Sequence, residues 1–202
     1  GVPLLVVRGE DGKARGFRNA CRHRGMAVAD GSGCTKAFVC PYHSWAYGLD
    51  GALKHVPGPE GFPELDHANH GLVPVHDVEE RAGMVFVTQD EPVATDTLAD
   101  IPNILSVDQV HFDTIEFVDK ANWKLIAELS MEGYHIKALH NRTFYPYGFD
   151  NLNVVETYGP NSRITFPFRR IEKLRDIPPE KRRVDGMLTY AYQMFPNTHV
   201  SV

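Results

Sequence analysis

Two short patterns near the start of the chain each pair a cysteine with a histidine. Cys21 and His23 are spaced as C-x-H, and Cys40 and His43 are spaced as C-x-x-H, with sixteen residues between the two pairs. Glycines and a proline lie in or beside both stretches, which favours loops. Two loops that face each other would present two sulfurs and two imidazole nitrogens to one metal centre.

Two kinds of metal centre use such donors. A structural zinc finger also takes two Cys and two His, but it normally keeps both Cys in one pair and both His in the other. Mixed pairs suit a two-iron, two-sulfide cluster, in which one iron keeps two thiolates and the other takes two imidazoles, as in Rieske centres. The mixed pattern therefore favours the cluster, with a zinc site and the absence of any metal as the alternatives.

The residues around the two pairs resemble those of a known family. CRHRG at 21–25, followed by CPYHSWAYGLDG at 40–51, is similar to the cluster-binding loops of Rieske non-haem iron oxygenases. The resemblance implies a [2Fe–2S] cluster that is held by Cys21, His23, Cys40 and His43. Imidazole ligands raise the reduction potential of such a cluster. The cluster would then be an electron relay, and a relay needs an acceptor.

A second group of candidate ligands lies in the segment NWKLIAELSMEGYHIKALH. The pattern predicts a helix over 123–139 with Asn122 as its N-cap. His135 and His140 are five residues apart, so at ~100° per residue they would point ~140° apart on an ideal helix. They could converge on one ion only if the helix ends or bulges between them. Glu132 shares the face of His135; the alternatives are packing roles for both histidines and an ordinary ion pair for Glu132.

The family resemblance extends to this segment. NWK, an acid three residues before a Tyr-His pair, and a second His after four more residues are typical of the family's catalytic helix. The resemblance implies that His135 and His140 bind a mononuclear Fe(II) in a triad of two His and one carboxylate, with the carboxylate expected beyond Val202. Glu132 would be a catalytic residue that does not itself bind the iron. It would orient His135 and form a hydrogen bond to His43 of the partner subunit.

Three features depart from the family pattern. Ser44 stands where the family usually has Gly, and Leu129 stands where Asn is common. Phe195-Pro196-Asn197 resembles a segment that lies tens of residues before the family's third iron ligand. Family members also have further strands before the position that corresponds to Gly1. The resemblance therefore implies a piece of a large, or alpha, subunit that lacks both ends.

These motifs need two folded units to position them. Apolar and β-branched runs predict a small antiparallel β domain of the Rieske type over 1–92, followed by a linker over 93–110 that turns weakly helical. Residues 111–202 are expected to form the catalytic mononuclear-iron domain, a helix on an antiparallel sheet that is START-like and C-terminally incomplete. The fold class is then α+β. The expected strands are 2–7, 14–19, 37–39, 44–47, 52–53, 72–78, 84–88, 112–119, 152–158, 162–168, 188–195 and 198–202.

The composition narrows the functional class. The chain has 202 residues, of which 43% are hydrophobic and 23% charged, as in ordinary soluble globular proteins. A net charge of −5 argues against a general affinity for nucleic acid or anionic membranes. No apolar run approaches the ~18 residues of a membrane span, and no signal peptide is visible, so we expect a cytoplasmic protein.

Three cysteines, two of them candidate ligands, suggest a reducing compartment. Cys34 is expected to be a free loop thiol, with a regulatory disulfide or an additional ligand as alternatives. Four further histidines show no ligand spacing and are expected to be surface or packing residues: His55, His67, His70 and His76.

The expected activity is that of a Rieske-type mono- or dioxygenase. Electrons from a ferredoxin or a flavin reductase would pass through the [2Fe–2S] cluster to the mononuclear Fe(II), which would use dioxygen to hydroxylate or demethylate a small organic substrate, with aromatic compounds as the expected class. The resemblance also implies a homotrimer, with or without small beta subunits. The alternatives are a Rieske electron-transfer protein without oxygenase activity and a binding protein with an inactive second site.

Overall fold

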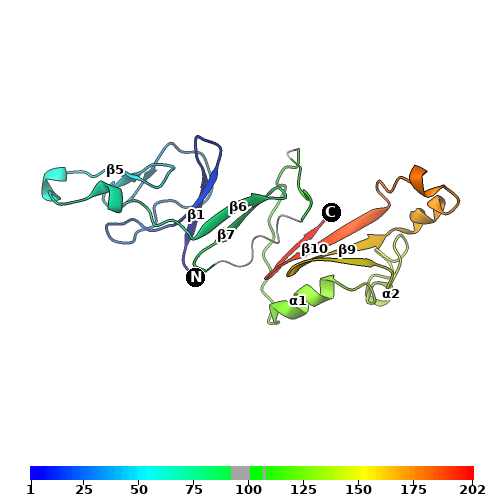
Figure 1. The fold of residues 1–202 in the computed structure, drawn as a ribbon. Helices are drawn as coiled ribbons and strands as arrows, with labels where there is room; N and C mark the ends of the chain where they lie inside the picture. The colour runs from blue at the N-terminus through cyan, green and yellow to red at the C-terminus, as the bar shows by residue number, and fades with distance from the viewer. Residues whose placement is uncertain (92–100, 107) are drawn as a thin grey trace. The chain divides into compact units, whose positions relative to one another are not determined.

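The computed structural model describes residues 1–91, 101–106 and 108–202, and the chain divides into two compact units, Gly1–Thr95 and Asp96–Val202 (Figure 1). Each unit is built of small antiparallel sheets with few helices, so the predicted α+β class is confirmed. The predicted linker over 93–110 falls in part on residues outside the described ranges and stays a prediction. Within the described residues, no helix is long and apolar enough to cross a membrane.

The first unit consists of three antiparallel sheets. Two of them are hairpins, and the third has three strands in the order β3-β4-β5. The elements are β1 Leu4–Arg8, β2 Ala14–Arg18, β3 Phe38–Val39, β4 Ala46–Tyr47, β5 Leu53–His55, the 3₁₀ turns η1 Pro59–Gly61 and η2 His67–Asn69, β6 Asp77–Arg81 and β7 Met84–Thr88.

Aromatic side chains fill the core of this unit. Phe17, Trp45 and Tyr47 are at most 5% exposed and pack with the two candidate thiols, Cys21 and Cys40. Gly51 has φ of +80°, and a Cβ there would overlap the ring of Phe17. Only a glycine fits this turn, because it tolerates the left-handed conformation and leaves room for the ring. The core thus extends directly beneath the loops that carry the cysteines.

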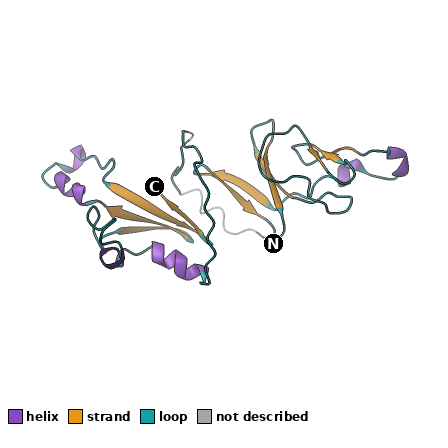
Figure 2. Cartoon of the chain, turned by 180° about the vertical axis from the view of Figure 1, so that it is seen from behind, coloured by secondary structure: helices purple, strands orange, loops and turns teal. Residues whose placement is uncertain are grey.

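The second unit is a four-stranded antiparallel sheet in the order β11-β10-β9-β8, and both views show helix α1 lying on one side of it (Figures 1 and 2). Ile164 and Ala191 of the sheet pack with Ile136, which lies on the short helix α2. The elements are α1 Trp123–Ser130, α2 Ile136–Leu139, β8 Val154–Tyr158, β9 Asn161–Pro167, the 3₁₀ turns η4 Arg169–Leu174 and η5 Pro179–Lys181, β10 Leu188–Met194 and β11 Thr198–Ser201.

The predicted helix over 123–139 is wrong in its extent. Asn122 caps α1 as predicted, since its side chain accepts a hydrogen bond from the Lys124 N–H at 3.0 Å, but α1 ends at Ser130. The carboxylate of Glu132 then accepts hydrogen bonds from the backbone N–H groups of Tyr134 and His135. A side chain that takes these donors competes with the helical ladder, so a new turn starts there and becomes α2.

The predicted strand over 112–119 is also wrong, because the structure has no strand there. Phe112 is 98% exposed and Val118 is 89% exposed. Alternation of apolar and polar residues creates a face, but a strand also needs a partner for its backbone hydrogen bonds, and no strand of the described chain pairs with this segment.

Smaller differences concern the ends of elements. The strand predicted at 72–78 begins only at Asp77, and residues 72–76 contribute only an isolated bridge at Pro74. The strand predicted at 44–47 is shortened to Ala46–Tyr47. Helical character expected in the linker is absent from 101–106 and 108–110, and the other residues of 92–110 lie outside the described part. The remaining predicted strands are present with ends shifted by a few residues.

The core of the second unit can be tested at Ile164, which is 1% exposed on β9. We expect Ile164→Ala to lower the free energy of unfolding by about 2–4 kcal/mol, because it removes buried methyl groups and leaves a cavity. Val155 lies opposite Ile164 in the ladder but is 58% exposed, so Val155→Ala is the matched control and should change stability by less than about 1 kcal/mol. Urea denaturation followed by circular dichroism measures both; equal losses would contradict the assigned core.

Candidate metal centres

The two cysteine–histidine loops have the same backbone turn. In the first, the Cys21 carbonyl accepts from the Gly25 N–H at 2.8 Å, and the Cys21 N–H donates to the Met26 carbonyl at 2.7 Å. In the second, the Cys40 carbonyl accepts from the Ser44 N–H at 2.9 Å, and the Cys40 N–H donates to the Trp45 carbonyl at 2.9 Å. The loops are thus equivalent from each cysteine onward, although the histidine follows after two residues in one and three in the other.

The fourth residue after each cysteine has a left-handed backbone, with φ of +75° at Gly25 and +60° at Ser44. This conformation is why glycine is favoured at the position. Ser44, where the family usually has Gly, keeps the same conformation with a side chain present. The departure noted in the sequence therefore changes the residue type and preserves the turn.

The loops bury the sulfurs and bring the imidazoles together. Cys21 and Cys40 are 4% and 2% exposed, and both are free thiols. The ring centroids of His23 and His43 lie 4.7 Å apart at an interplanar angle of 61°. Two inner sulfurs and two outer imidazoles match the donor division of a Rieske cluster, with one iron on each pair.

One atom shows that the first site fits a metal. Nδ1 of His23 is buried and has no hydrogen-bond partner. A buried unpaired nitrogen is costly unless it binds something. Burial, with smaller contributions from the charges of His43 and Arg24, lowers the pKa of His23 and favours the neutral form that ligates metals.

The grouping of the donors bears on the choice of metal. In the part of the chain that the structure describes, no three His, Cys, Asp or Glu side chains come close enough to hold one ion. A single zinc would need its donors around one point. A Rieske cluster would divide the four donors between two irons, with the sulfurs on one and the nitrogens on the other.

Aromatic residues support both imidazoles. Trp45 stacks on His23 with ring centroids 5.1 Å apart, and Tyr42 stacks on His43 at 3.9 Å. Below them, the hydroxyl of Tyr47 lies 3.2 Å from Sγ of Cys21 and accepts from the Arg22 N–H at 3.0 Å. Because its acceptor role is taken by Arg22, the hydroxyl hydrogen is available to the sulfur.

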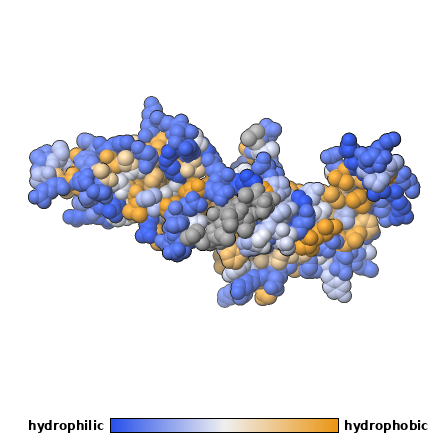
Figure 3. Space-filling view, viewed as in Figure 1, coloured by the Kyte–Doolittle hydropathy of each residue, from blue (hydrophilic) through white to orange (hydrophobic). Residues whose placement is uncertain are grey.

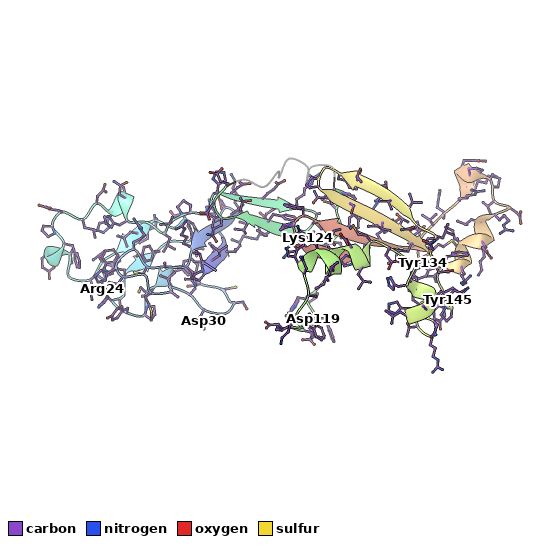
Figure 4. All side chains as sticks on the ribbon, turned by 90° about the horizontal axis from the view of Figure 1, so that it is seen from below. Arg24, Asp30, Asp119, Lys124, Tyr134 and Tyr145 are labelled. Carbon is purple, nitrogen blue, oxygen red and sulfur yellow. The ribbon has the colours of Figure 1, made fainter. Side chains whose placement is uncertain are left out.

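The second candidate site lies around α2. His135 precedes this helix and His140 follows it, and their ring centroids lie 5.3 Å apart at an interplanar angle of 67°. The two histidines are thus the residues that flank a one-turn helix, whereas the sequence predicted His135 inside a continuous helix. Figure 4 labels Tyr134, which precedes His135 in the chain, and Tyr145, which follows α2 and His140.

Glu132 orients one of these histidines. Its Oε1 pairs with Nδ1 of His135, so Nε2 is the ring nitrogen left for a metal. The hydrogen bond from His135, followed by those from two backbone N–H groups, lowers the pKa of Glu132. A carboxylate that holds the second nitrogen of a ligating imidazole fixes its tautomer and ring orientation.

A cavity of about 750 Å³ adjoins this site. His135, His140 and Glu132 all line it, together with residues of β10 and β11. Among its described lining residues, Glu132 is the one acid, so the third iron ligand expected beyond Val202 stays a prediction. The other lining residues are mainly apolar or aromatic and include Trp123, Ile126, Phe144, Phe166, Tyr190, Gln193 and His199.

Sequence reasoning missed several residues of both sites. Tyr47 gave no signal beyond an aromatic residue in a strand. His199 and Gln193 line the cavity because the register of β10 and β11 places them opposite each other, and burial lowers the pKa of His199. The period of two predicts only which residues of one strand share a face. The pairing of β10 with β11 is what brings Gln193 and His199 together. Cys34 is exposed and unpaired, as expected.

Comparison with known families accounts for both halves of the chain. The family described as "Rieske [2Fe-2S] domain" matches residues 1–92, and the family described as "Ring hydroxylating alpha subunit (catalytic domain)" matches residues 105–202. The chain therefore belongs to the alpha subunits of Rieske non-haem iron oxygenases. The cofactors of this family are the [2Fe–2S] cluster and the mononuclear iron that the sequence predicted.

The chain is also similar to curated proteins that are named for particular oxygenase activities. The glycine betaine monooxygenase oxygenase subunit of Chromohalobacter salexigens is 39% identical over 68% of this chain and 32% of its own length. The carnitine monooxygenase oxygenase subunit of Escherichia coli is 37% identical over 69% and 40%. The chloroplastic choline monooxygenase of Spinacia oleracea is 30% identical over 97% and 46%. The chain thus spans between a third and a half of these relatives.

Solved structures agree with the fold. The quaternary ammonium Rieske monooxygenase CntA in complex with L-carnitine superposes with a TM-score of 0.74 at 26% identity, over 100% of this chain and 54% of that chain. Naphthalene 1,2-dioxygenase from Rhodococcus sp. gives 0.73 at 26% identity, over 98% and 53%. The expectation of aromatic substrates is not supported, because these curated relatives are named for quaternary ammonium compounds.

The contact between Tyr47 and Cys21 predicts an effect on the cluster. A hydrogen bond to a ligand sulfur stabilises the more negative, reduced form and raises the potential. We expect Tyr47→Phe in the natural full-length protein to lower the reduction potential by up to about 60 mV, equivalent to roughly 1.4 kcal/mol for one electron. Redox titration followed by EPR measures the shift. Tyr42→Phe, at an exposed ring stacked on His43, is the control, and an equal shift in both variants would contradict the assigned role.

Proposed function

We propose that this chain is the electron-relaying and iron-binding part of an oxygenase that acts on a quaternary ammonium compound. The observation that carries the proposal is the meeting of His135 and His140 beside Glu132 at a cavity, in a chain that also bears a Rieske loop pair. The chain supplies an electron relay, a metal site and a place for an organic substrate.

In this proposal the cluster is held by the two buried thiolates and the two imidazoles, Cys21, Cys40, His23 and His43. Bound there, it would supply one-electron transfer from a ferredoxin or a flavin reductase. His43 is the more exposed of the two imidazoles, since its side chain lies on the surface of the second loop, whereas His23 is covered by Trp45 and Phe62. Electrons would therefore leave the cluster through the exposed imidazole of His43.

The mononuclear iron is held by His135 and His140, with a carboxylate from beyond Val202 as the third ligand. Bound there, the iron supplies dioxygen activation. Glu132 is the positioning acid: Oε1 holds Nδ1 of His135 and Oε2 accepts from two backbone N–H groups. Its side chain is 44% exposed, so His43 of the partner subunit could still approach the carboxylate. One carboxylate between two imidazoles would orient both and couple the two metal sites.

The cavity suits a cationic headgroup. Trp123, Phe144, Phe166 and Tyr190 line it, and aromatic faces attract quaternary ammonium groups. Glu132 adds a negative charge near the metal end. The names of the curated relatives support the same substrate class. The reaction would insert one atom of dioxygen into a C–H bond next to the nitrogen, while two electrons and two protons reduce the other atom to water.

The second candidate function is a Rieske electron-transfer protein without oxygenase activity. An electron carrier needs no second metal site and no cavity, so the arrangement around α2 favours the oxygenase. We expect a homotrimer, with or without beta subunits, because coupling of Glu132 to His43 of the partner subunit requires neighbouring chains. The expected location is the cytoplasm.

The role of His135 can be tested in the natural full-length protein with its reductase. We expect His135→Ala to abolish oxidation of trimethylammonium substrates and to lose the iron beyond the cluster, while the visible and EPR spectra of the Rieske cluster stay unchanged. His67→Ala, at an exposed histidine of the first unit, is the control and should keep full activity. Retention of substrate oxidation by His135→Ala would instead support the electron carrier, and a protein that binds only zinc would contradict both functions.

A variant of Glu132 can distinguish an effect on electron transfer from an effect on metal binding. We expect Glu132→Gln to keep the cluster and the mononuclear iron, because the amide oxygen can still accept the hydrogen bond, but to slow oxidation of the reduced cluster by about 10–100-fold. Stopped-flow absorbance after mixing the reduced enzyme with dioxygen and substrate measures this rate. Glu128→Gln on α1 is the matched control, and an unchanged rate in Glu132→Gln would count against the coupling.

A further inference from the structure

A second pocket shares a lining residue with the catalytic cavity. It has a volume of about 390 Å³. Among the described residues, Phe144 is the one that lines both this outer pocket and the cavity of His135 and His140. The lining of the outer pocket is Phe144, Pro146, Tyr147, Phe168, Arg169 and Arg170.

The position of the Phe144 ring is set by its neighbours. The Phe144 N–H donates to the carbonyl of His140 at 3.1 Å, so the ring follows directly after a candidate iron ligand. Its centroid lies 5.7 Å from that of Phe168. A Cβ at Gly148 would overlap the ring. The ring therefore occupies space that the missing side chain of Gly148 leaves open.

The two spaces differ in charge. The outer pocket carries the guanidinium groups of Arg169 and Arg170, and neither forms an ion pair with an acid in the described part of the chain. Arg169 is held in place, since its Nε donates to the Tyr145 carbonyl at 3.2 Å and its guanidinium lies 4.8 Å from the Tyr145 ring centroid. The guanidinium of Arg170 lies 4.9 Å from the ring centroid of Phe168.

The catalytic cavity, by contrast, has the carboxylate of Glu132 and no Lys or Arg among its described lining residues. A molecule with a cationic head and an anionic tail would match this order of charges, with its head among the aromatic residues of the cavity and its tail at the arginines. Arginine binds carboxylates in a bidentate geometry. Phe144 stands between the two spaces.

We propose that Phe144 is a specificity-determining residue that limits substrate length. Its ring closes the catalytic cavity against the arginine-bearing outer pocket, so short trimethylammonium substrates are accepted and longer trimethylammonium carboxylates are excluded. Removal of the ring joins the two spaces, and the guanidinium groups then favour a carboxylate tail over a neutral one. This inference rests on the proposed function and concerns the shape of the same site.

The test uses the natural full-length holoenzyme with its reductase and two series of substrates. One series consists of trimethylammonium carboxylates with an increasing number of methylene groups, and the other of trimethylammonium alcohols of equal length. We expect Phe144→Ala to raise the ratio of kcat/KM for long over short carboxylates by about tenfold or more, since a single methylene in a fitted pocket is worth about 10–200-fold. Phe144→Leu should give a smaller increase.

Two further variants distinguish the effect of the Phe144 ring on substrate length from the effect of the arginines on the charge of the tail. Tyr147→Ala truncates an aromatic ring that lines the outer pocket alone and should leave the length profile unchanged. Arg170→Ala added to Phe144→Ala should abolish the preference for long carboxylates over long alcohols while keeping the preference for length. Iron content and the Rieske EPR spectrum should be the same in all variants.

Equilibrium binding of the same compounds to the iron-loaded proteins gives a readout that does not need turnover. The same dependence of affinity on length in the wild type and in both Phe144 variants would overturn the inference while leaving the proposed function in place. Binding that follows the expected pattern without any oxidation would support the inference and contradict the proposed oxygenase activity. Failure of every compound to bind any of the proteins would overturn both.

Discussion

The site around His135 and His140 depends on the hydrogen bonds that the carboxylate of Glu132 accepts. This carboxylate accepts hydrogen bonds from two backbone N–H groups and pairs with the imidazole of His135. The first contacts end one helix and begin another, and the last contact aims a ring nitrogen at the cavity. The same group thus shapes the backbone and the ligand, so the acid is required for the geometry before it has any part in electron transfer.

The first site rests on a different constraint, the repeated turn after each cysteine. Both turns need a left-handed residue four positions on, at Gly25 and Ser44, and both direct their sulfur into a core of aromatic side chains. This geometry buries both sulfurs. The imidazole of His43 lies at the surface, while that of His23 is half-buried beneath Trp45 and Phe62.

Much of the molecule could be predicted from its sequence. The cysteine–histidine spacing predicted two loops that bring their imidazoles together, the period of two predicted most strands, and Asn122 marked the start of α1. Two predictions were wrong for physical reasons. The helix over 123–139 does not continue, because Glu132 competes for its backbone donors. Residues 112–119 have the alternation of a strand, but strand formation needs a neighbouring strand, and alternation within one segment carries no information about that neighbour.

The sequence by itself determined which atoms can bind metal, because ligand chemistry belongs to residue types and their spacing. Only the tertiary structure decided that Tyr47 lies on the sulfur of Cys21 and that one residue, Phe144, lines two pockets of different charge. These are relations between segments brought together by the packing of helix against sheet and of loop against core. They depend on long-range contacts, to which no local pattern in the chain corresponds.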